Sequence, residues 1–140
     1  MRYWDASALV PLCVAEAGTA AARRLVRGGI VTWAVSAVEI AAAIERRGRE
    51  GGLTDTDRAT ARAALRELTA AWTEISAIGA VRERALRLVA THALRAADAM
   101  QLAAALVAVS DRTAGHEFVC TDGRLRDAAA REGFRVLPGG

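Results

Sequence analysis

Residues 117–137, EFVCTDGRLRDAAAREGFRVL, contain strand and helix patterns in close succession. Residues 117–121 and 134–137 have the apolar character of short strands, and residues 123–131 have a helical pattern. Gly133 follows the helical stretch, where glycine commonly ends a helix. Two parallel neighbouring strands need a crossover of about a dozen residues or more, which a helix usually supplies. This stretch therefore predicts an α/β fold with a parallel sheet.

The same alternation extends through the rest of the chain. Further strands are predicted at residues 2–5, 30–35 and 72–76, and helices at residues 17–26, 36–48, 59–71, 81–93 and 98–109. From residue 98 the sequence is apolar on nearly all sides, which is typical of a helix buried against a sheet. We expect one domain over residues 1–140, folded as a three-layer α/β/α sandwich around a mostly parallel sheet of about five strands.

Some local signals refine this outline. Residues 6–11 are interpreted as a turn after the first strand. Ser36 and Glu39 have the spacing of a capping box, which predicts that a helix starts at Ser36. Thr54 offers an N-cap to the following helix.

The charged residues exclude several kinds of site. All 19 basic residues are arginine, against 16 acids, so the net charge is +3. The absence of lysine removes P-loop chemistry, Schiff-base chemistry and the lysine with which phospho-aspartate folds hold a phosphoryl group. A mild positive charge is compatible with nucleic acid but decides little.

Other features concern the cell compartment. The longest apolar run, residues 99–109, is shorter than the roughly 18 residues that span a bilayer, and Gln101 interrupts it. Cys13 and Cys120 lack the spacing of a redox or zinc site, so we expect buried, reduced thiols. These features predict a cytoplasmic protein that does not enter the membrane.

Four acids occur where parallel sheets bind ligands, beyond the carboxyl ends of the strands. Asp5 follows the first strand and Asp122 follows the strand at residues 117–121. Glu39 lies in the first turn of the helix after the second strand, and Asp98 begins the buried helix. We expect the four carboxylates to converge on one cleft, where a divalent cation would offset their mutual repulsion.

Oxygen-only ligands suit Mg²⁺ or Mn²⁺, whereas zinc would call for Cys or His. One or two such ions would activate a water and hold a phosphodiester in line for hydrolysis. Each acid also has a structural interpretation: Asp5 and Asp122 as turn or cap residues, and Asp98 as a helix N-terminal charge. Taken singly, Glu39 is more simply the capping-box partner of Ser36.

Further candidates surround this predicted cleft. Ser7 is either a contact to a bound water or phosphate or an ordinary turn residue. Glu16 and Asp127 either extend the acidic cluster or are solvated surface acids. The arginines nearest the predicted cleft are either phosphate contacts or, more simply, solvated helix residues; they are Arg95, Arg124 and Arg126.

The order of these pieces resembles a PIN domain, specifically the small VapC toxins. The matching pieces are YWDASALV at residues 3–10, VSAVEI at residues 35–40, RAADA at residues 95–99 and FVCTDGRL at residues 118–125. The resemblance implies an Mg²⁺- or Mn²⁺-dependent endoribonuclease that forms a homodimer and is inhibited by a cognate VapB-like antitoxin. The metal ligands that it implies are Asp5, Glu39, Asp98 and Asp122, with Ser7 and Asp127 as looser matches.

Two positions depart from the family pattern. Cys120 stands where a Ser or Thr is frequent, and Gln101 occupies a helix position that is frequently His. Neither departure removes a carboxylate, so activity is still expected.

Three other functions remain as alternatives. The first is a PIN-like scaffold that binds RNA or a protein without cleaving it. The second is a phospho-acceptor with Asp5 as nucleophile, although such folds want a second acid near Asp5 and a lysine. A nucleotide-binding fold ranks last, because the sequence has neither GxGxxG after the first strand nor GxxxxGK.

Overall fold

The computed structural model describes residues 1–139. Within them, five parallel strands form one sheet in the order β3-β2-β1-β4-β5. The strands are β1 (Arg2–Trp4), β2 (Val31–Trp33), β3 (Thr73–Ile75), β4 (Glu117–Val119) and β5 (Arg135–Leu137). The predicted parallel sheet of about five strands is confirmed.

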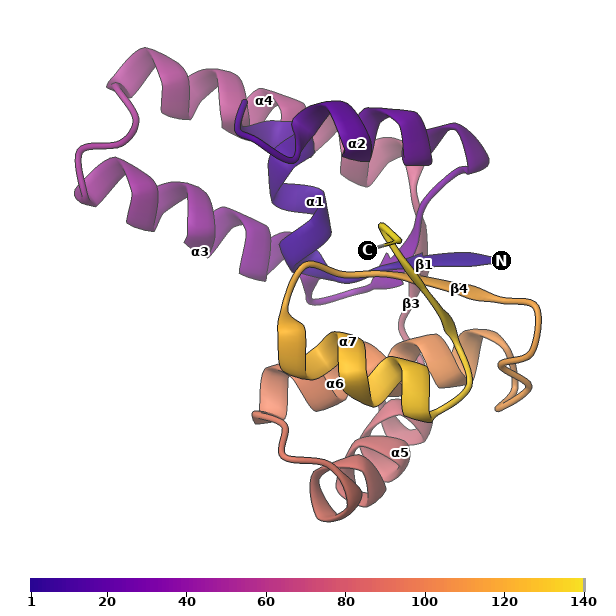
Figure 1. Cartoon of the computed structure of the whole chain (residues 1–140). Helices are drawn as coiled ribbons and strands as arrows, with labels where there is room; N and C mark the ends of the chain where they lie inside the picture. Colours follow the sequence, from indigo (N-terminus) through magenta and orange to yellow (C-terminus); the bar gives the residue numbers. More distant parts are fainter. Residues whose placement is uncertain (140) are drawn as a thin grey trace.

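Helices cover both faces of the sheet (Figure 1). On one face lie α1 (Ala6–Cys13), α2 (Thr19–Leu25) with a 3₁₀ turn (Val26–Gly28), α3 (Ser36–Arg49) and α4 (Asp55–Ala71). On the other lie α5 (Ile78–Thr91), α6 (Ala96–Ala108) and α7 (Gly123–Arg131). Each face has its own cluster of buried apolar side chains, so the expected three-layer α/β/α sandwich is confirmed.

The alanine-rich helix α6 lies at the centre of the α5–α7 layer. Leu102, Ala103 and Ala104 are fully buried, because small side chains let α6 pack closely against both the sheet and α5. The prediction of a buried helix in this part of the chain is confirmed. Among residues 1–139, no helix combines the length and apolar content that a membrane crossing requires.

The turn predicted at residues 6–11 is wrong, because these residues belong to helix α1. Asp5 caps this helix by accepting a hydrogen bond from the backbone N–H of Ser7 at 3.2 Å. Pro11 lies inside α1, two residues before its end, and its missing N–H removes one hydrogen bond from the helical ladder. The apolar face of the helix is buried against the sheet, and that burial outweighs the turn signal from proline.

The capping box predicted at Ser36 is also wrong, although α3 does start there. Val35 is the N-cap residue and no side chain caps this helix. The Ser36 hydroxyl is fully buried and hydrogen-bonds with Thr32 Oγ1 at 2.7 Å, so it is turned into the core. A capping box does occur in α4, where Thr54 and Asp57 exchange hydrogen bonds, so the N-cap predicted at Thr54 is confirmed.

Gly133 ends α7 as predicted. Its φ of +103° lies in the region that glycine tolerates best. Backbone hydrogen bonds from Gly133 to Ala130 and from Phe134 to Ala129 close the helix in a Schellman motif. The chain then enters β5 directly, which places β5 beside β4.

Candidate active site

A pocket of about 680 Å³ lies at the carboxyl edge of the sheet, and all four predicted acids line it. Asp5 follows β1 and Asp122 caps α7 after β4, while Glu39 and Asp98 lie in the first turns of α3 and α6. β1 is central, with β2 on one side and β4 on the other. Chain connections leave β1 and β4 toward opposite faces of the sheet, which opens a crevice of the kind where α/β proteins bind ligands.

Asp5 is the most enclosed of the four carboxylates, at 3% exposure. Its Oδ2 atom accepts hydrogen bonds from the Ser7 backbone N–H and hydroxyl, and Cys120 Sγ lies 3.6 Å away. Burial raises the pKa of Asp5 to about 6, the bonds from Ser7 oppose this rise, and the charge of Asp98 adds to it. Ser7 therefore stabilises the charged form of Asp5.

Glu39 is held by a buried network centred on Gln101, which is 1% exposed. Gln101 Nε2 donates to Glu39 Oε2 and to Ser36 Oγ, and Gln101 Oε1 accepts from the Tyr3 hydroxyl at 2.6 Å. Burial raises the pKa of Glu39 to about 7, the bond from Gln101 opposes the rise, and the charges of Asp5 and Asp98 add to it. Glu39 is therefore a positioned carboxylate and not the partner in a helix cap.

Asp98 and Asp122 are held less tightly. Asp98 is half-buried and makes no hydrogen bond within residues 1–139. Burial, followed by the charge of Asp122, raises the pKa of Asp98, and the charge of Arg95 opposes this rise. Asp122 Oδ1 accepts from the backbone N–H of Leu125 at 3.0 Å and so caps α7. Both the structural and the chemical interpretation of Asp122 are compatible with this geometry.

The donor chemistry of the pocket fits Mg²⁺ or Mn²⁺. Asp5, Glu39 and Asp122 each use one carboxylate oxygen in hydrogen bonds within residues 1–139. The other oxygen of each, namely Asp5 Oδ1, Glu39 Oε1 and Asp122 Oδ2, is left for a ligand. Burial and the charges of neighbouring carboxylates raise the pKa values of Asp5 and Glu39. A bound cation would favour the charged forms of both groups. As the side chains stand, however, no three His, Cys, Asp or Glu of this part of the chain are already grouped as metal ligands, so binding an ion would require side-chain adjustment.

The remaining predicted residues divide into two groups. Ser7 and Glu16 line the pocket, and Glu16 pairs with Arg47 at 3.2 Å. Asp127 is exposed on α7 and does not line the pocket. The position of Asp127 therefore does not support the interpretation that it extends the acidic cluster.

The three predicted arginines also differ in placement. Arg95 precedes α6 and its charge acts on Asp98. Arg126 donates to the backbone carbonyls of Cys120 and Pro138, each at 2.7 Å, so its guanidinium anchors the end of β4 to the C-terminal segment. Arg124 is exposed in the first turn of α7 and, like Arg95 and Arg126, is not part of the pocket lining.

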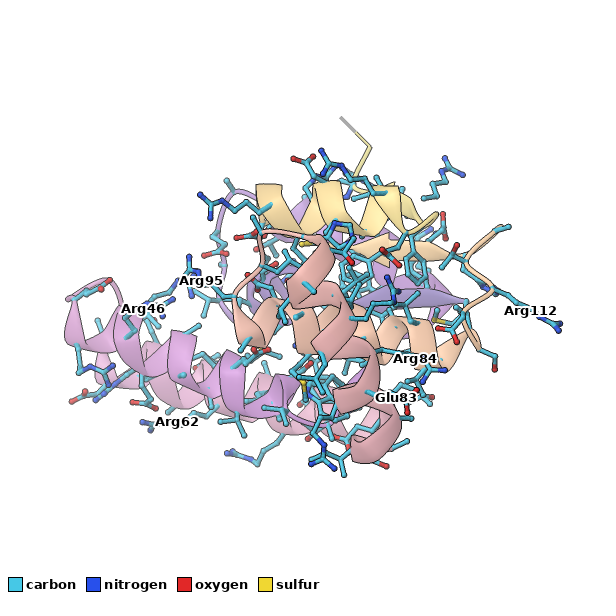
Figure 2. The ribbon with its side chains drawn as sticks, turned by 90° about the horizontal axis from the view of Figure 1, so that it is seen from below. Arg46, Arg62, Glu83, Arg84, Arg95 and Arg112 are labelled. Atoms are coloured by element: carbon cyan, nitrogen blue, oxygen red, sulfur yellow. The ribbon has the colours of Figure 1, made fainter. Side chains whose placement is uncertain are left out.

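Two charged residues of the pocket were not identified from the sequence. Arg46 and Arg47 of α3 line the pocket, and in Figure 2 the Arg46 side chain projects on the same side of the molecule as Arg95, far from Arg112. Their signal in the sequence is helical spacing, because they follow Glu39 by seven and eight residues, about two turns of a helix.

Comparison with known proteins identifies the family of this chain. The family model described as PIN domain matches residues 2–131. The chain belongs to the PIN-domain family. Relatives of this PIN domain include Ribonuclease VapC45 and Ribonuclease VapC49 from two strains of Mycobacterium tuberculosis, CDC 1551 / Oshkosh and ATCC 25618 / H37Rv. Each is 35% identical over 138 residues, which cover 97% of this chain and 94% of the relative, so the resemblance to VapC-type PIN domains is confirmed.

A solved structure supports the fold. The crystal structure of PAE2754 from Pyrobaculum aerophilum superposes with a TM-score of 0.65, covering 97% of this chain and 88% of that chain. The two share 18% sequence identity, so this likeness bears on the fold alone.

Proposed function

We propose that this PIN domain is a metal-dependent endoribonuclease that hydrolyses phosphodiester bonds of RNA, and that it acts as a VapC-like toxin. The observation that carries the proposal is the convergence of Asp5, Glu39, Asp98 and Asp122 on one pocket at the carboxyl edge of the sheet. The relatives named Ribonuclease VapC45 and Ribonuclease VapC49 support the reaction class and the toxin assignment.

The proposed cofactor is Mg²⁺ or Mn²⁺, held by the same four carboxylates. When bound, the ion supplies positive charge that activates a water and stabilises the negative oxygens of the phosphodiester. Ser7 keeps the Asp5 carboxylate in place, and Gln101 does the same for Glu39. Because the pKa values of Asp5 and Glu39 are raised to about 6 and about 7, cation binding at neutral pH would release protons from these groups.

The proposed partners follow from the resemblance to VapC toxins. They are the RNA substrate, a cognate VapB-like antitoxin that inhibits the nuclease, and a second copy of the chain in a homodimer. We also propose a cytoplasmic location. Exposed apolar side chains on α5, Ile78 at 59% and Leu86 at 67%, support a protein contact, and light scattering coupled to size-exclusion chromatography would measure the oligomeric state.

The second candidate is a non-catalytic PIN scaffold that binds RNA or a protein. One observation favours it: within residues 1–139, no three potential ligands are already grouped around a metal position. The four carboxylates weigh against it, because a binding surface for polyanionic RNA gains nothing from a buried acidic cluster.

Purified chain, separated from any bound partner under denaturing conditions and refolded, is the material for the test. It is incubated with a structured RNA pool in Mg²⁺, in Mn²⁺ and in EDTA. The proposal predicts internal cleavage with either metal and none in EDTA. Metal-independent cleavage, or intact RNA in all three conditions with well-folded protein, would favour the scaffold.

A further inference from the structure

The pocket with the four carboxylates also contains positive charge that the proposed hydrolysis does not use. Arg46 and Arg47, termed the α3 arginine pair, line this pocket. They lie about 11 Å from Glu39 along the axis of α3, at a rise of about 1.5 Å per residue. A single pocket therefore extends from an acidic region, suited to a cation, to a basic region, suited to an anion.

One terminal nitrogen of the Arg47 guanidinium has a partner and the other has none in the described part of the chain. Its Nη2 atom lies 3.2 Å from Glu16 Oε2, and the Glu16 backbone N–H is in turn held by Thr19 Oγ1 at 2.9 Å. The other terminal nitrogen, Nη1, is buried and has no hydrogen-bond partner within residues 1–139. Buried donors without a partner are rare in proteins, so this atom has hydrogen-bonding capacity left for a ligand.

Arg46 complements this arrangement from the solvent side. Its side chain is exposed, and no carboxylate within residues 1–139 pairs with it. Together the pair presents one guanidinium paired with Glu16 and one exposed guanidinium without a carboxylate partner within residues 1–139. Guanidinium groups bind phosphate through two parallel hydrogen bonds, which matches the ligand class expected beside a phosphodiesterase centre.

We propose that the α3 arginine pair binds a phosphate of the RNA strand that flanks the scissile phosphate, and that Glu16 positions Arg47 for this contact. The inference rests on the proposed ribonuclease function. Contacts to a flanking phosphate fix the register of the strand without reading its bases. The pair thus places the scissile bond against the carboxylates, while Glu16 orients an arginine and is not a metal ligand.

The test measures binding of a labelled single-stranded RNA by fluorescence anisotropy in EDTA, over a series of salt concentrations. The variants are Arg47→Gln, Arg46→Gln and, as matched control, Arg49→Gln, which lies exposed on the same helix outside the pocket. For Arg47→Gln we expect binding about tenfold weaker at low salt. The slope of log affinity against log salt should fall by about 0.7, the value for one phosphate contact on a single strand.

Kinetics and a conservative variant separate binding from structural effects. In multiple-turnover cleavage with Mn²⁺, KM should rise in both pocket variants while kcat changes little, and Arg47→Lys should recover part of the salt slope. If Arg47→Gln fails to fold, the test rests on Arg46→Gln. Arg46 is exposed and unpaired within residues 1–139, so its replacement should not disturb folding.

The outcomes distinguish this inference from the proposed function. If wild type binds and cleaves RNA while Arg46→Gln and Arg47→Gln match Arg49→Gln in affinity and salt slope, the inference is overturned and the ribonuclease proposal stands. If well-folded wild type neither binds nor cleaves RNA, both are overturned.

Discussion

Asp5 is the residue at which burial and hydrogen bonding oppose each other most directly. Its carboxylate is 3% exposed, and Ser7 donates two hydrogen bonds to it. These bonds do not fully offset desolvation and the charge of Asp98, so its pKa rises from 3.8 to about 6. The folded chain therefore binds this proton more tightly than the unfolded chain does.

This shift gives a pH prediction with a definite sign. Between about pH 4 and pH 6 the folded state binds more protons at Asp5 than the unfolded state, so the free energy of unfolding falls as pH rises. The loss from Asp5 alone is about 3 kcal/mol, complete above about pH 7. About 1.4 kcal/mol of this loss falls between pH 5 and pH 7.5. Urea denaturation in EDTA at these two pH values measures that part, with Asp5→Asn as reference.

Other carboxyls titrate in the same range, so the informative quantity is the difference between wild type and Asp5→Asn. Asp111 and Glu132, whose pKa values are lowered by Arg84 and Arg87, contribute the opposite sign in both proteins. The stability of the variant relative to wild type should be about 1.4 kcal/mol greater at pH 7.5 than at pH 5. An equal difference at both values would contradict the account of Asp5.

Gln101 gives a second prediction at the residue scale. Gln101→Leu leaves the Tyr3 hydroxyl and Glu39 without their buried partner, at a cost of about 2–4 kcal/mol. Tyr3→Phe removes one member of the same network and should cost about 1 kcal/mol. Both are measured by urea denaturation at pH 7.5, and a Gln101→Leu variant as stable as Tyr3→Phe would show that the network does not hold Glu39.

At the scale of elements, the strands and long helices could be predicted because their apolar periodicity is strong. The exceptions are short-range signals with two meanings. An aspartate with a proline six residues later, as at Asp5 and Pro11, is compatible with both a turn and a short capped helix. The helix forms because the apolar face of α1 is buried in the core. Ser36 and Glu39 fit a capping box in sequence, but the core offers Ser36 and Glu39 better partners in Thr32 and Gln101.

Helix α4 carries the prediction that belongs to this scale. Its capping box joins the Thr54 side chain to the Asp57 backbone N–H at 3.1 Å, and the Asp57 carboxylate to the Thr54 backbone N–H at 3.0 Å. Thr54→Ala should lower the free energy of unfolding by about 1 kcal/mol. Thr69→Ala is the matched control, because Thr69 bonds only to a carbonyl within the same helix and alanine is the better helix former. Equal stability of the two variants would contradict the cap.

At the scale of the whole molecule, the sheet order determines which sequence-distant residues meet. The acids after β1 and β4 could be assigned to one edge from the sequence, because parallel strands share their carboxyl ends. Helical spacing places Arg46 and Arg47 about two turns after Glu39, but it does not place them in the pocket. Their position there depends on the direction in which α3 crosses that edge (Figure 1). Likewise, sequence spacing does not show that the Arg126 guanidinium donates hydrogen bonds to the backbone carbonyls of Cys120 and Pro138.

Cation binding should stabilise the whole fold. A ligand that binds only the folded state adds about 2.7 kcal/mol at a concentration one hundred times its dissociation constant. We therefore expect Mn²⁺ to raise the melting temperature at pH 7.5, and less so at pH 5, where protons compete at Asp5 and Glu39. Asp98→Asn should reduce the shift; an equal shift in this variant would place the ion elsewhere.

RNA cleavage by wild type, Asp98→Asn and Asp127→Asn, each in Mn²⁺ and in EDTA, tests most directly whether the four carboxylates form a metal-dependent nuclease centre. Asp98 makes no hydrogen bond within residues 1–139 and Asp127 is exposed outside the pocket, so neither replacement should disturb the fold. We expect Asp98→Asn to lower kcat by on the order of 10²-fold or more, Asp127→Asn to cleave like wild type, and EDTA to abolish cleavage in all three. Cleavage by Asp98→Asn at the wild-type rate, or cleavage in EDTA, would contradict a metal-dependent centre built on these carboxylates.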